Sequence, residues 1–131
     1  MNLPLDAYPD YARSERIADG TLHALGVAFA LAGAVALLGW AARSVDAGQL
    51  TALTVYGVAL VATFTASALY HMSPWKRLRP TLRRIDHAAI YLKIAGTFTP
   101  LAVMIGTGFA YGVLALVWAM ALWGMTHKLF F

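Results

Sequence analysis

The chain has 131 residues, of which 60% are hydrophobic and only 12% are charged. This composition excludes a soluble domain of that length, because too few polar residues remain to cover its surface. The net charge of +4 comes from basic residues beside apolar segments, which is typical of topology signals, so we expect no nucleic-acid partner. The absence of cysteine leaves nitrogen and oxygen as the possible metal ligands.

Four apolar runs follow a polar N-terminal segment. We expect residues 1–20 to be cytoplasmic, with an interfacial helix around Arg13 to Asp19. About 20 residues in a helix cross the hydrocarbon core, so each apolar run predicts a transmembrane helix. The runs cover about 21–42, 50–71, 86–105 and 109–126 within a membrane region 21–127, and a basic loop spans 72–85. The sequence therefore predicts an all-α membrane protein with four transmembrane helices.

The distribution of lysine and arginine predicts the orientation in the membrane. With four spans, the N-terminus, the loop 72–85 and the C-terminus lie on one side. That side carries Arg13, Arg16, Lys76, Arg77, Arg79, Arg83, Arg84 and Lys128, whereas the opposite side carries Arg43. The positive-inside rule therefore places both termini in the cytoplasm.

Polar side chains inside the second run form one stripe. Thr63, Ser67 and His71 are spaced i, i+4 and i+8, which puts them on one helix face. We interpret Thr63 as an interhelical hydrogen-bonding residue. Ser67 is open between that role and a role beside His71, and His71 alone suits an interfacial residue as well as a metal ligand.

Asp86 opens the third run at the same membrane depth as His71. Its carboxylate suits two roles, capping of the helix N-terminus or metal binding, and both are compatible. His23 opens the first run in the same layer. Two histidines and one aspartate would suit zinc with an open position, where a bound water becomes a nucleophile near neutral pH. Lys93, deeper in the third run, either pairs with a carboxylate or extends toward the interface.

Several segments together resemble the hemolysin III family, which is bacterial and similar to the adiponectin and progestin receptors. Glu15 and the segment His23-Ala24-Leu25-Gly26 look like that family's opening pattern. The later segments are Ser67-Ala68-Leu69-Tyr70-His71, Arg84-Ile85-Asp86-His87 and Ala95-Gly96-Thr97-Phe98-Thr99-Pro100. The resemblance extends from about Glu15 to the C-terminus.

The resemblance implies the N-terminal part of a seven-helix bundle in the bacterial inner membrane, with zinc near its cytoplasmic side. His71 matches a zinc ligand of the receptors, and Asp86 and Ser67 match residues that hold the zinc-bound water. Asp86 is therefore a candidate for both metal binding and catalysis, and Ser67 for catalysis. The similarity of the wider superfamily to alkaline ceramidases implies metal-dependent hydrolysis of a lipid amide or ester.

The chain departs from the family pattern at its C-terminal end. The receptors take two zinc ligands from a late His-x-x-x-His motif, and no such motif follows Asp86 here. We expect His71 and Asp86, with a possible contribution from His23, to form part of a site, and the isolated chain to be inactive. The alternatives are a truncated member, a fragment, or a short form that assembles with another chain, including a homo-oligomer. A non-enzymatic role in lipid homeostasis or as a helix-bundle partner, or a membrane-lytic role, also stays open.

Overall fold

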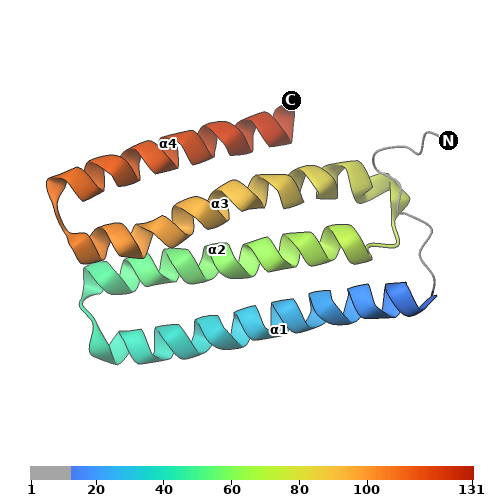
Figure 1. Cartoon of the computed structure of the whole chain (residues 1–131), viewed down its shortest axis with the longest axis horizontal. Helices are drawn as coiled ribbons and strands as arrows, with labels where there is room; N and C mark the ends of the chain where they lie inside the picture. The colour runs from blue at the N-terminus through green and yellow to red at the C-terminus, as the bar shows by residue number, and fades with distance from the viewer. Residues whose placement is uncertain (1–12) are drawn as a thin grey trace.

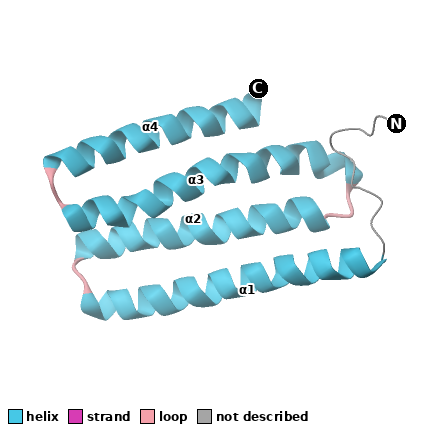
Figure 2. Ribbon diagram, in the orientation of Figure 1, coloured by secondary structure: helices cyan, strands magenta, loops and turns pink. Residues whose placement is uncertain are grey.

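The computed structural model describes residues 13–131, and this part of the chain is helical (Figures 1 and 2). The long helices are α1 (Arg13–Ser44), α2 (Ala47–Met72), α3 (Arg79–Ile105) and α4 (Gly108–Phe130), and a short 3-10 helix, η1 (Lys76–Leu78), precedes α3. All four long helices are long and apolar enough to cross a membrane. The predicted all-α membrane fold with four transmembrane helices is confirmed.

The four helices lie side by side in chain order, each antiparallel to the next (Figure 1). Within residues 13–131, α1 packs against α2, α2 against α3 and α3 against α4, and no contacts join α1 to α3 or α4. The chain therefore forms an open row. We call the end where α1 begins, α2 ends, α3 begins and α4 ends the basic end, because it carries the basic residues of η1 and its neighbours.

Small residues fill the interfaces of the row. The buried hydrophobic residues are all alanines, among them Ala34, Ala59 and Ala95. A Cβ added to Gly57 would lie 3.5 Å from the Cβ of Ala34, so α1 and α2 approach closely there. Large apolar side chains such as Phe29 and Trp123 are exposed instead. This is the reverse of a soluble core and fits helices whose outer surface faces lipid.

The helices extend beyond the apolar runs from which they were predicted. Helix α1 begins at Arg13, so the polar segment near Asp19 continues into the first span without a break. Helix α3 begins at Arg79 and holds Pro80 in its first turn, where a missing N–H group costs nothing. The predicted loop 72–85 is therefore largely helical. Hydropathy identifies the part of a helix that lies in lipid, but it does not show where the helix begins or ends. The N-terminal part of the predicted segment 1–20 lies outside the described residues.

Side-chain caps and one glycine define the turns at the other end of the row. The Asp46 side chain accepts a hydrogen bond from the N–H of Gln49 at 2.8 Å and caps α2. Thr107 caps α4 in the same way through the N–H of Ala110, at 3.1 Å. Gly106 ends α3 with φ of 71°, in the left-handed region that glycine adopts without strain. These tight turns hold neighbouring helices antiparallel and fix which residues face each other at the basic end.

Candidate metal centre

Two ligand-type side chains lie one turn apart near the beginning of α1. Asp19 and His23 are spaced i, i+4, which brings their side chains together on one helix face. The Nε2 atom of His23 lies 3.2 Å from Oδ1 of Asp19. Both residues are half-buried, with 36% of the Asp19 side chain and 20% of the His23 side chain exposed. This partial burial comes from the neighbouring end of α2.

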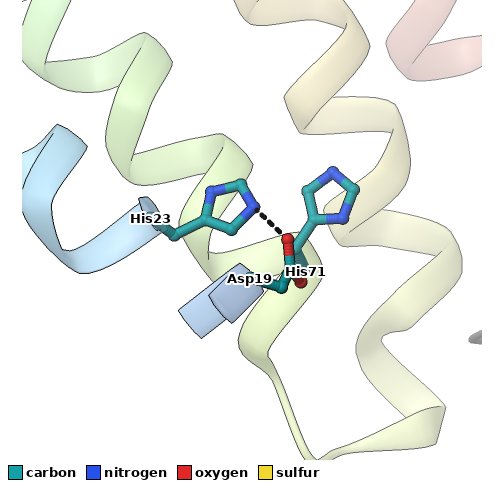
Figure 3. A group of neighbouring side chains, drawn as sticks. All are labelled: Asp19, His23 and His71. Carbon is teal, nitrogen blue, oxygen red and sulfur yellow. Dashed lines mark ion pairs between the residues drawn. The ribbon is translucent and has the colours of Figure 1, made fainter. Parts of the chain in front are cut away.

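The third side chain comes from the last turn of α2. The imidazole of His71 stacks against that of His23, with ring centroids 4.8 Å apart and ring planes 15° apart. Figure 3 shows His71 approaching from α2 while Asp19 and His23 project from α1. The close α1–α2 interface fixes this pairing, because a Cβ on Gly26 would lie 3.0 Å from the Phe64 ring.

The three side chains have a composition that could hold a metal ion. Their ligand atoms, two imidazole nitrogens and one carboxylate oxygen, all lie within 4.8 Å of one another. Zinc bonds to such atoms are about 2.0–2.2 Å long, so neighbouring ligands in a tetrahedron are about 3.4 Å apart. The separation of 3.2 Å between Asp19 and His23 fits that geometry. His71 is exposed, which leaves its ring free to move the short distance still needed.

The predicted residues Ser67 and Asp86 lie on the neighbouring segments but are not among these three. Ser67 precedes His71 by one turn on α2 and is half-buried. Asp86 is half-buried on α3, about two turns after the helix begins at Arg79. Of the two roles left open for Asp86, capping of α3 is wrong, because the N-cap position is Leu78 and has no side-chain cap.

Thr63 has the packing role that its position predicts. Its hydroxyl donates to the carbonyl of Ala59 at 2.7 Å within α2 and also lies 3.2 Å from the carbonyl of Ala89 on α3. The interhelical interpretation of this residue is confirmed. The polar stripe of α2 therefore has two parts. Thr63 contributes to helix packing, whereas His71 belongs to the cluster of ligand-type groups.

Comparison with known proteins identifies the family. The family model described as "Haemolysin-III related" matches residues 12–131, nearly the whole chain. The chain belongs to the hemolysin III family. It is 36% identical over 119 residues to a hemolysin-3 homolog of Bacillus subtilis (strain 168), which covers 89% of the chain and 55% of that relative. It is 32% identical over 118 residues to hemolysin-3 of Bacillus cereus, with 89% and 54% covered.

This member of the hemolysin III family spans about half the length of the curated relatives that it matches. No solved structure matches it significantly. The family match, with the four apolar helices, establishes a multi-pass membrane protein. Of the segments that carried the resemblance, those with His23, His71 and Asp86 lie toward the basic end of α1, α2 and α3, whereas Ala95–Pro100 lies in the other half of α3.

The residue that sequence reasoning missed in this hemolysin III family member is Asp19. It lies within residues 1–20, which the sequence predicts to be a polar N-terminal segment outside the membrane, so the sequence analysis does not group it with His23. The available signal was the i, i+4 spacing of Asp19 and His23, together with the apolar sequence that follows both.

Proposed function

We propose that this protein takes part in zinc-dependent hydrolysis of a lipid amide or ester at the cytoplasmic face of the bacterial inner membrane. The observation that carries the proposal is the convergence of His71 with His23 beside a carboxylate at one end of the row. Two nitrogens and one oxygen are a ligand set of hydrolytic zinc enzymes, which keep the remaining position for water or substrate. Positive charge at this end favours its placement in the cytoplasm.

The roles of the side chains follow from their places on α2 and α3. His71 would bind zinc, which when bound acts as a Lewis acid and activates water for attack on a carbonyl carbon. Asp86, half-buried on the helix packed against α2, would accept the proton of the attacking water and return it to the leaving group. Ser67, one turn from His71, would orient that water by a hydrogen bond.

The surroundings of His71 suit a substrate that arrives from the bilayer. Leu69 and Met72, on either side of His71, are 52% and 49% exposed. At a membrane boundary, such apolar side chains contact acyl chains, while the polar linkage of the lipid lies level with the histidines. The exposed side of His71 also leaves room for further helices, or for a second copy of the chain, to complete the reaction centre.

Lipid hydrolysis by the purified full chain tests this proposal. The sequence alone favours an inactive isolated chain, but the meeting of two histidines and a carboxylate supplies a fuller ligand set than the sequence predicts. The chain in lipid nanodiscs, loaded with zinc, is therefore expected to release fatty acid from an N-acyl lipid or an ester lipid. Asp86→Asn is expected to lower the rate by about 100-fold or more, because general acid–base catalysis contributes about that much. His71→Ala is expected to lower it at least as far, because it removes a zinc ligand. His127→Ala, an exposed histidine at the end of α4, is the matched control.

Two results would contradict the proposal. One is a rate that stays the same in zinc-stripped protein or in both variants. The other is zinc-loaded protein that hydrolyses neither lipid class, which would indicate a membrane protein without enzymatic activity.

A further inference from the structure

We propose that Asp19 is a metal ligand and that Asp19, His23 and His71 together bind zinc between α1 and α2. This inference rests on the function proposed above, which takes zinc as the metal, and it deepens that function by naming the ligands. That function needs His71 and Asp86, whereas this inference assigns the ligand carboxylate to α1.

Geometry distinguishes Asp19 from the other carboxylates of the described chain. It is the acidic residue whose oxygen lies within 4.8 Å of two histidine nitrogens from different helices. Glu15, one turn earlier on the same helix, is exposed and lies outside the group. Asp86 lies on α3, which does not contact α1 within residues 13–131. The two half-buried carboxylates at the basic end therefore have different positions and suit different roles.

A helical ion pair between Asp19 and His23 does not account for the whole cluster. Such i, i+4 pairs are common on helix surfaces and stabilise a helix only slightly. The pair needs nothing from α2, yet His71 places its ring parallel to that of His23 and close to the same carboxylate. Two imidazoles and a carboxylate from segments almost 50 residues apart meet at one point, as metal ligands do.

A metal at this point would join α1 to the rest of the protein. Helix α1 lies at one side of the row, with α4 at the other, and among the described residues it packs only on α2 (Figure 1). Two ligands lie in the first turns of α1 and one lies in the last turn of α2, so the metal links the two helices at the basic end. Because a metal that binds the folded state stabilises it by mass action, zinc should raise the thermal stability of the chain.

Zinc titration of the purified full chain tests the ligand set. Wild-type protein in detergent is expected to bind one zinc ion per chain by calorimetry and by elemental analysis. Asp19→Asn, His23→Ala and His71→Ala are expected to weaken zinc binding by more than about 100-fold, beyond the loss usual for residues that only support a ligand. The matched controls are Glu15→Gln on the same helix and His127→Ala, and both should bind zinc as the wild type does.

Asp86→Asn separates this inference from the proposed function. We expect that variant to keep zinc, since Asp86 is outside the ligand group. If Asp19→Asn binds zinc as tightly as Glu15→Gln while Asp86→Asn loses it, the inference is wrong and the proposed function stands. If wild-type protein binds no zinc, or if His71→Ala binds it normally, both are wrong.

A folding check and a thermal melt distinguish loss of the zinc site from misfolding of a variant. Each variant is first compared with wild type without zinc by circular dichroism, and only variants with wild-type helicity are scored. Added zinc is expected to raise the melting temperature of wild type and Glu15→Gln but not of Asp19→Asn. Equal stabilisation of Asp19→Asn would overturn the inference.

Discussion

Polar side chains in this protein form hydrogen bonds across helix interfaces, because lipid offers no hydrogen-bonding partners. Thr99 is the clearest case. Its hydroxyl donates to the carbonyl of Ala95 at 2.7 Å and accepts a hydrogen bond from the indole Nε1–H of Trp118 at 3.0 Å. The carbonyl freed by Pro100 belongs to Gly96, one residue later than the one that Thr99 binds. Thr99 therefore links α3 to α4 and does not compensate for the proline.

Removing the Thr99 hydroxyl should weaken the contact between α3 and α4. In Thr99→Val the indole N–H of Trp118 loses its acceptor, and we expect a loss of about 0.6 kcal/mol, the average for hydrogen bonds between membrane helices, and at most about 1.7 kcal/mol. Unfolding in a mixed-detergent titration measures it. Trp118→Phe should cost a similar amount, and the double variant should cost less than the sum of the two. Fully additive losses would show that the two side chains do not interact.

At the scale of helices, the sequence predicted which segments span the membrane but not where the helices end. Hydropathy located all four spans, because the membrane interior imposes one strong requirement on length and polarity. It could not show that α3 begins at Arg79, because Pro80 is compatible with both a loop and a first helical turn. The position of Asp86 depended on that boundary, and so did its interpretation as a cap.

The candidate site shows the same division between local and tertiary information. The sequence alone indicates His71 and His23, because a histidine at either end of an apolar run is costly to place in the membrane and can be recognised without knowing the fold. Their stacking could not be predicted, since it depends on how close α1 and α2 approach through Gly26 and Gly57. Asp19 was missed for that reason: without the neighbouring helix it resembles any polar residue of an N-terminal segment.

Close helix packing predicts that glycines differ in their tolerance of substitution. A Cβ on Gly96 would lie 2.5 Å from the Cβ of Ala59 and 3.6 Å from the carbonyl oxygen of Val55, so Gly96→Ala must push α3 away from α2. We expect a loss of about 1–3 kcal/mol, as for other overpacked interiors. Gly112→Ala is the control, because nothing lies within 4 Å of its added Cβ. In the same detergent titration, equal stability of the two variants would contradict this account of the interface.

At the scale of the whole molecule, the open row formed by residues 13–131 leaves both broad faces of α2 and α3 without cover from another described helix. One face of α3 carries a shallow groove of about 400 Å³ lined by Ile90, Lys93, Ile94, Thr97, Phe98 and Leu101. Lys93 lies near the middle of α3 and is exposed, with its Nζ atom 5.8 Å from the centroid of the Phe64 ring. No ion pair to Lys93 is formed by the residues that the structure describes. The aromatic face of Phe64 is thus its favourable contact at membrane depth.

Replacing Lys93 should reveal whether its face contacts lipid alone. A lysine at the centre of a transmembrane helix costs roughly 2.5–3.5 kcal/mol for insertion, of which contact with Phe64 and extension toward the interface recover a part. Lys93→Met keeps the length of the side chain and removes the charge, so we expect it to stabilise the chain by about 1–2 kcal/mol in lipid bilayers. Lys128→Met, outside the apolar span, is the control and should have no effect. The reverse sign, a loss of stability in Lys93→Met, would contradict a lipid-facing Lys93. It would instead mean that the ammonium group has a stronger partner than the Phe64 ring, such as a carboxylate of a second copy or of a further helix, because breaking a buried charged pair is strongly destabilising.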